Sequence, residues 1–222
     1  MRTPKLLLLA TVLMLGIAPA ASAAIVNIEA DITQVVDNYG LLDSSVAVGN
    51  KVYFSYSFDP ATPDSSPAVS DVGRYLQYYS NGQTLDASFG NYSAAMTSGY
   101  NTIQINLQRG VPNVGFFDDY QVTAYTQSAD LGTLFLQTTL SYKRPYLTDP
   151  GLFTTDALPS TLDLADFNSN SLLIQSMGSG SDFWYLKAEP VALDLNAVPL
   201  PGAFWLLFSG LTGLAAVRRR KR

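Results

Sequence analysis

Alternation between apolar and polar residues is the feature that most constrains how this chain can fold. At residues 25–33 the apolar side chains of Val26, Ile28 and Ile32 alternate with polar neighbours. Successive side chains of a β-strand point to opposite faces of a sheet, so this period of two predicts a strand with one buried and one wet face. Similar patterns recur at 52–58, 85–89, 103–107, 120–124 and 134–142, and further strand-like runs lie at 172–175 and 183–195.

Turn signals separate these runs. Asn81-Gly82 lies between Tyr79 and Thr84 and predicts a two-residue β-hairpin. Asp149-Pro150-Gly151 predicts a loop, and 162–167 could form a single helical turn. Because short strands at roughly even spacing are typical of all-β domains, we expect an antiparallel β-sandwich or jelly roll.

The N-terminus has the pattern of a secretory signal peptide. Basic residues Arg2 and Lys5 precede an apolar run at 6–17, and Ala21 and Ala23 form a small-x-small cleavage site. The apolar run is too short to span a bilayer comfortably. We therefore expect residues 1–23 to be removed by signal peptidase after the secretion machinery exports the chain, and 24–197 to form the body.

The C-terminus carries a second apolar run. Residues 203–217 contain no charge, and as a helix they would reach about 22 Å, which makes them a marginal transmembrane helix. The body would lie outside the cytoplasm, and the basic end would lie inside it. The tail could be a permanent anchor, a lipid-anchor signal or a sorting signal, although a lipid-anchor signal does not end in basic residues. The cytoplasmic basic cluster is Arg218, Arg219, Arg220, Lys221 and Arg222.

The order of features at 198–222 resembles the PEP-CTERM sorting signal of Gram-negative bacteria. Val198, Pro199, Leu200 and Pro201 match its proline-rich entry, in the variant where Leu200 replaces the name-giving Glu. The resemblance implies that an exosortase-type membrane peptidase cuts the tail. The inner-membrane anchoring would then be transient, and the protein would reach the cell surface or the extracellular matrix.

A second, weaker resemblance lies inside the body. The stretch VGNKVYFSYSFDPATPDSSPAVSDVGRY is similar to a segment of exported PEP-CTERM proteins, in which a strand, a Pro/Asp/Ser loop and a Gly-x-Tyr follow one another. The resemblance implies a β-sandwich body, and most such proteins have no assigned activity. The likeness is carried by Gly49, Phe54, Tyr56, Phe58, Asp59, Pro63, Asp64, Pro67, Gly73 and Tyr75.

Charge and composition exclude several function classes. All 18 acidic residues but only six of the 13 basic ones lie at 24–197, so the body has a formal charge of −12. Such a body would repel nucleic acid. The chain has no Cys and no His, which excludes disulfides, Ser-His-Asp and Cys-His catalysis, and zinc sites built on these residues.

Acidic side chains offer one candidate site. Asp59, Asp64 and Asp71 lie in a Pro/Ser-rich loop and could hold Ca²⁺, the one cofactor the sequence suggests. The ligand spacing of an EF-hand is missing, and a solvated loop in which these residues cap turns is the favoured interpretation. Asp118-Asp119 is a second acidic spot, but neighbours in a strand point to opposite faces.

Aromatic side chains offer a second candidate site. Tyr78 and Tyr79 are the best candidates for exposed rings that stack on a glycan, because adjacent strand residues cannot both point inward. Packing in the core is the favoured interpretation for any single ring. The wider set of candidates is Tyr75, Tyr78, Tyr79, Tyr100, Phe116, Phe117 and Trp184.

These features together predict an exported, non-enzymatic surface or matrix protein with a structural or adhesive role in exopolysaccharide or biofilm. Two alternatives stay open. The first is a carbohydrate-binding module. The second is a polysaccharide hydrolase that uses paired Asp residues or calcium, for which the sequence offers no motif.

Overall fold

The computed structural model describes residues 22–69, 71–111, 115–144, 151–178 and 183–199, and Ala24–Asn196 forms one compact unit. This unit is all-β, and its described residues add two short 3₁₀ turns, η1 (Tyr79–Asn81) and η2 (Leu164–Asp166). The strands are β1 (Ser22–Asp37), β2 (Lys51–Phe58), β3 (Val72–Tyr78), β4 (Leu85–Phe89), β5 (Tyr92–Ala95), β6 (Tyr100–Val111), β7 (Gly115–Ser128), β8 (Gly132–Arg144), β9 (Ser169–Ser176) and β10 (Trp184–Pro199).

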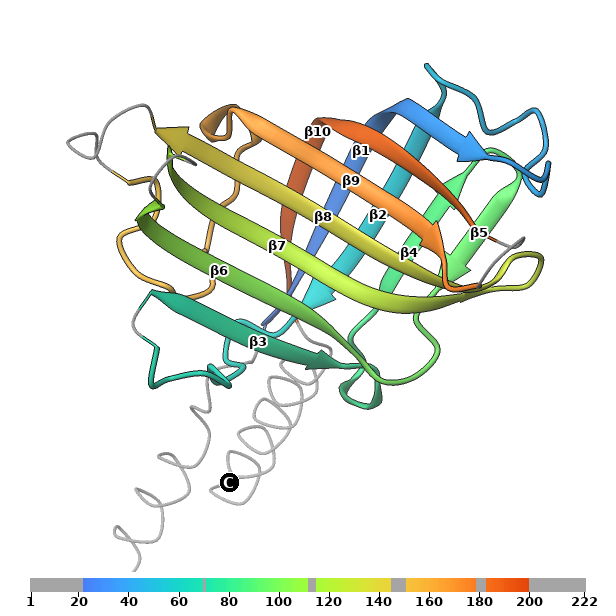
Figure 1. Ribbon diagram of the computed structural model, residues 1–222. Coiled ribbons are helices and arrows are strands. Elements are labelled where there is room, and N and C mark those ends of the chain that lie inside the picture. The colour runs from blue at the N-terminus through green and yellow to red at the C-terminus, as the bar shows by residue number, and fades with distance from the viewer. Residues whose placement is uncertain (1–21, 70, 112–114, 145–150, 179–182, 200–222) are drawn as a thin grey trace, which may run out of the picture. The chain divides into compact units, whose positions relative to one another are not determined.

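The strands form one sheet that closes on itself. Eight strands follow one another in the order β7-β5-β4-β2-β1-β10-β9-β8, and β8 pairs back with β7. Strands β6 and β3 extend the sheet beside β7 (Figure 1). On one side, closure rests on the short pairing of β5 with β7 at Ala95 and Gln127.

The predicted β-sandwich or jelly roll is therefore wrong, because the body is an eight-stranded closed barrel with two added strands. A sandwich has two separate sheets, whereas here β9 and β10 pair with each other and join the front and rear walls seen in Figure 1. A period of two requires only an inner and an outer face. Barrels and sandwiches both have these, so the pattern could not distinguish them.

Two local expectations had different outcomes. The hairpin predicted at Asn81-Gly82 is wrong, because β3 pairs with β6 while β4 pairs with β2 and β5. The turn instead is η1, followed by Gly82 with a φ of 82°. The helical turn expected at 162–167 is present as η2, and the Asp163 side chain accepts a hydrogen bond from the Ala165 N–H at its start.

The core fills the barrel with the inward faces predicted from the alternation. Val26, Ile28 and Ile32 of β1 are fully buried or nearly so. Large rings contribute to this core, and the centroids of Phe89 and Trp184 lie 6.0 Å apart. Burial of this much apolar surface is the main source of stability in a chain without disulfides.

Several predicted features fall at the ends. Ala23 lies in β1 and Val198 and Pro199 at the end of β10, whereas Ala21, Leu200, Pro201, the apolar run 203–217 and the basic cluster 218–222 lie outside the described residues. No helix within the described ranges is long and apolar enough to cross a membrane.

Candidate functional site

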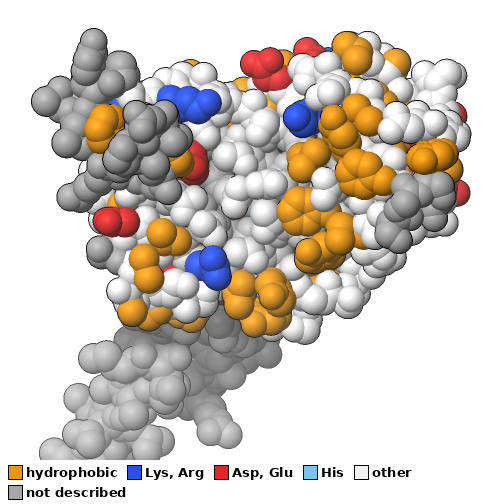
Figure 2. Space-filling view, viewed as in Figure 1, with side chains coloured by type: hydrophobic (Ala, Val, Ile, Leu, Met, Phe, Trp, Pro, Cys, Tyr) orange, Lys and Arg blue, Asp and Glu red, His pale blue; other side chains and the backbone are white. Residues whose placement is uncertain are grey.

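A row of aromatic side chains crosses the outer face of the wall formed by β3, β6, β7 and β8. Tyr78 pairs with Tyr100 and Tyr125 pairs with Phe135. The pairing of Asn101 with Ala124 places Tyr100 next to Tyr125 in the same antiparallel register. These four residues, Tyr78, Tyr100, Tyr125 and Phe135, are called the aromatic row. Figure 2 shows hydrophobic side chains gathered in a band on this face.

The rings of the aromatic row lie close together, and its three tyrosines are exposed to solvent. Ring centroids are 5.4 Å apart for Tyr78 and Tyr100 and 5.5 Å apart for Tyr125 and Phe135. The exposed fractions are 42% for Tyr78, 47% for Tyr100 and 59% for Tyr125. Three exposed rings that are neighbours in one line form a candidate binding surface.

The line continues over two more strands. Phe135 pairs with Gln175 of β9, and Gln175 pairs with Tyr185 of β10. The Tyr185 ring lies 6.0 Å from that of Phe183, and Lys187 Nζ lies 5.7 Å from its centroid. With about 4.8 Å between strands, the six positions span about 24 Å, which suits an extended ligand.

Neutral hydrogen-bonding groups flank the row. On β6, β7 and β8 the next outward position is occupied by Thr102, Thr123 and Gln137, and the position after that by Gln104, Gln121 and Thr139. None of these six described side chains is charged. A hollow of about 340 Å³ opens where Tyr100, Tyr125 and Phe135 meet Thr102 and Thr123. The surface therefore offers ring faces beside hydroxyl and amide groups.

The predicted aromatic candidates divide between this row and the core. Tyr78 and Tyr79 are both exposed, Tyr78 at the end of β3 and Tyr79 in η1. Tyr100 joins the row, whereas Tyr75 and Trp184 are buried. The two remaining candidates, Phe116 and Phe117, are half-buried near the start of β7.

Sequence reasoning missed Tyr125 and Phe135. Their neighbours Ala124 and Leu134 are buried, so the period of two already placed both rings on the wet face of their strands. An aromatic residue at a solvent-facing strand position was the signal by which the sequence could have identified both rings. Strand register then determines which of the solvent-facing rings are neighbours.

The carboxylates of Asp59, Asp64 and Asp71 are not brought together into a metal site. Among the described residues there is no group of three or more acidic side chains placed to hold a metal ion. Asp64 Oδ1 accepts hydrogen bonds from the N–H groups of Ser66 and Arg74, each at 2.8 Å. Asp59 Oδ1 accepts from Ala61 N–H at 2.8 Å, and Asp71 is exposed. The turn-capping interpretation accounts for the hydrogen bonds of Asp59 and Asp64.

The second acidic spot divides across the sheet, as expected for neighbours in a strand. Asp118 is buried, lies 3.1 Å from Arg144 Nη2 and accepts a hydrogen bond from the Leu152 N–H at 2.7 Å. Asp119 points the other way, and burial raises the pKa of its carboxyl, with smaller influences from Ser141, Asp118 and Lys143. The pair is not a shared carboxylate site.

Comparisons of the chain with models of protein families, with curated proteins and with solved structures gave no match. The class of protein is therefore defined here by fold and surface alone. It is a closed all-β protein with an exposed row of aromatic rings, flanked by uncharged polar side chains on β6, β7 and β8.

Proposed function

We propose that this chain is an exported, non-enzymatic surface or matrix protein that binds a neutral polysaccharide along the aromatic row. The observation that supports the proposal most directly is the aromatic row itself. Sugar rings have an apolar face that can pack on an aromatic ring, and their hydroxyls need donors and acceptors such as those of Thr102, Thr123 and Gln137.

Other extended ligands fit less well. Exposed aromatic rows also stack nucleic-acid bases, but such sites need basic residues along the phosphate chain. The body instead has a formal charge of −12. An anionic polysaccharide would be repelled for the same reason. A neutral glycan would not be repelled by the negative charge of the body.

Binding is favoured over turnover on this surface. The positions of the aromatic row and the two flanking polar rows on β6, β7 and β8 contain no carboxylate. Glycoside hydrolysis by the common mechanism needs two carboxyl groups about 5–10 Å apart. The proposal accordingly combines the structural role expected in exopolysaccharide with the carbohydrate-binding alternative.

The two ends of the chain support an extracellular location for this function. The signal peptide expected at 1–23 and the PEP-CTERM-like tail at 198–222 would deliver the body to the compartment that contains exopolysaccharide. Exosortase-type processing belongs to this proposal and rests on resemblance.

The proposal is tested by replacing Tyr125 with Ala and measuring binding to a panel of neutral polysaccharides by depletion from solution. Loss of a central ring should weaken binding at least tenfold, about 1.4 kcal/mol, as is common for aromatic positions at the centre of an interface. Tyr39→Ala is the matched control, because Tyr39 is also 59% exposed but lies off the row. Unfolding curves should show that both variants are folded.

Two results would contradict the proposal. One is that the unmodified protein binds none of the neutral polysaccharides. The other is that Tyr125→Ala binds as well as Tyr39→Ala.

A further inference from the structure

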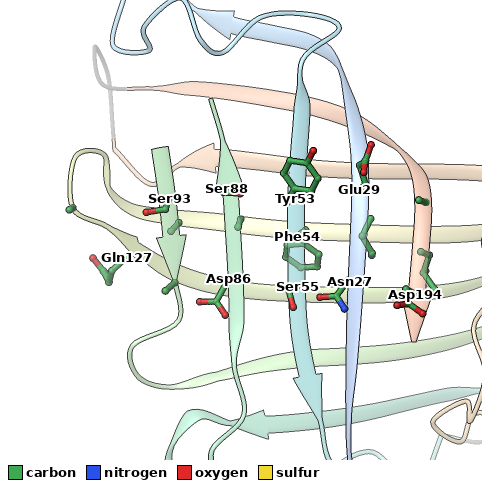
Figure 3. A pocket seen from close by; sticks show the side chains of 17 residues that line it. Asn27, Glu29, Tyr53, Phe54, Ser55, Asp86, Ser88, Ser93, Gln127 and Asp194 are labelled. Atoms are coloured by element: carbon green, nitrogen blue, oxygen red, sulfur yellow. The ribbon is translucent and has the colours of Figure 1, made fainter. Parts of the chain in front are cut away.

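A second and larger hollow, of about 660 Å³, lies on the outer face of β1, β2, β4 and β5. Strand register arranges its polar residues in two lines. Asn27, Ser55 and Asp86 are consecutive partners in the first line, and Figure 3 shows them on neighbouring strands. We call this hollow the acidic groove. The second line consists of Glu29, Tyr53, Ser88 and Ser93.

The polar groups of the acidic groove are available to a ligand. Within the described part of the chain, no hydrogen bond to protein is formed by the side chains of Ser55, Asp86 or Ser88. The Tyr53 ring is 54% exposed and lies in the same hollow. A ring face beside several unengaged hydroxyls and a carboxylate is the arrangement expected for a small polar ligand.

The charge of the acidic groove is negative. Its lining residues in the described part of the chain include Glu29, Asp86 and Asp194 but no Lys or Arg. Glu29 is already paired, at 2.9 Å, with Lys51, which also contacts Asp31. Asp194 accepts a hydrogen bond from Asn196 Nδ2 at 2.6 Å.

Within the described residues, the Asp86 carboxylate has neither an ion-pair partner nor a hydrogen-bond partner. Partial burial raises the pKa of its carboxyl above the ordinary value, and no neighbouring cation offsets that effect. A carboxylate in this situation gains most from a ligand that brings a positive charge. A cation near the Tyr53 ring would also gain from its π-face.

We infer that the acidic groove is a separate binding site for an oligosaccharide that carries a protonated amine. Asp86 receives the ammonium group, the Tyr53 ring packs against a sugar ring, and Ser55 and Ser88 bond to hydroxyls. The inference does not depend on the aromatic row, whose flanking side chains on β6, β7 and β8 are uncharged and suit a different ligand. Gln127 lines both hollows, so the two surfaces adjoin.

The test titrates the purified chain by calorimetry with three tetrasaccharides that share one backbone linkage. These are a tetramer of glucosamine, its fully N-acetylated form and a tetramer of glucose. The glucosamine tetramer should bind at least tenfold more tightly than the other two. Asp86→Asn, which keeps the shape and removes the charge, should abolish that preference.

Controls separate the acidic groove from general acidity. Asp71 is also exposed, and its carboxylate forms no hydrogen bond with the described residues, so Asp71→Asn should leave the preference unchanged. Spermidine is the competitor that has charge but no sugar ring. The inference is overturned if spermidine binds as tightly as the glucosamine tetramer, if all three tetramers bind equally, or if Asp86→Asn retains the preference.

Failure of this inference can be told apart from failure of the proposed function. Tyr125→Ala should leave binding of the glucosamine tetramer intact. If it removes that binding, the amine-bearing ligand lies on the aromatic row and the acidic groove is not its site. If neutral polysaccharides fail to bind while the tetramer preference depends on Asp86, the proposed function is wrong and this inference holds.

Discussion

At the scale of single residues, the core contains a pair of hydrogen-bonded tyrosine hydroxyl groups. Tyr56 and Tyr120 are both fully buried, and the Tyr56 hydroxyl donates to the Tyr120 oxygen at 2.8 Å. Burial raises the pKa of both phenols above the usual value of about 10. The Tyr120 oxygen thus provides the acceptor for the buried Tyr56 hydroxyl.

The pair predicts non-additive mutations. Tyr56→Phe leaves the buried Tyr120 hydroxyl without its partner and should cost about 1–3 kcal/mol of unfolding free energy. Replacing both residues by Phe removes both polar groups and should cost less than the single change. Urea unfolding of the two single variants and the double variant measures this. Additive costs would show that the hydrogen bond does not couple the two residues.

The same pair predicts loss of stability at high pH. In the unfolded chain both phenols ionise near pH 10, while in the folded barrel they stay neutral to higher pH because their pKa is raised. The unfolded state then binds fewer protons, so unfolding free energy falls as pH rises above about 10. Unfolding curves between pH 8 and 11 should show a steeper fall for the unmodified protein than for the double Phe variant. Equal slopes would contradict this.

At the scale of elements, the described part of the segment between β8 and β9 is hydrogen-bonded to β7 and β3 near its start. Asp118 accepts the Leu152 N–H, and the Tyr75 hydroxyl donates to the carbonyl oxygen of Asp156 at 2.9 Å. Gly73 passes so close to this carbonyl that a Cβ there would collide with it. The Gly-x-Tyr motif of β3 therefore has a structural role in docking this segment.

Gly73→Ala should accordingly destabilise the protein by about 1–3 kcal/mol, because either the backbone of the segment or β3 must shift. Tyr75→Phe removes only the hydrogen bond and should cost less, about 1 kcal/mol. Chemical unfolding of both variants provides the measurement. A Gly73→Ala variant as stable as the original chain would show that the segment adapts without cost.

The loop before β3 has a comparable role. Arg74 N–H donates to Asp64, and Arg74 carbonyl accepts the Ser65 N–H at 2.7 Å. These bonds use backbone groups of β3, which within the described residues pairs with β6 alone. Occupied edge groups are less available to strands of other molecules, so the Pro/Asp/Ser loop protects an edge.

At the scale of the whole molecule, processing of the two ends would determine a measurable mass for the exported protein. If the two ends act as their sequences indicate, the intact mass of the protein recovered outside the inner membrane should correspond to a chain that starts near Ala24 and lacks the last ~20–25 residues. Mass spectrometry of the membrane fraction and the medium, taken separately, measures this. A membrane-bound form that retains Arg222 would show a permanent anchor instead of a sorting signal.

The sequence alone was sufficient to predict the strand character and the buried faces. The run at 52–58 became β2, with Val52, Phe54 and Tyr56 buried as the alternation required. Local pattern predicts this reliably because a strand side chain can point only inward or outward. The alternation also predicted that Tyr78 and Tyr79 could not both point inward; both are exposed, and Tyr79 lies in η1 and not in a strand.

Tertiary structure decided how the strands are partnered and therefore where the candidate sites lie. Closure of the ring depends on pairings between segments far apart in the chain, such as Ala95 with Gln127. The aromatic row and the acidic groove depend on register in the same way, because Tyr100 and Tyr125, or Ser55 and Asp86, become neighbours only when their strands align. A period of two determines which face of a strand is wet, but the partner and its register follow from packing of the whole barrel.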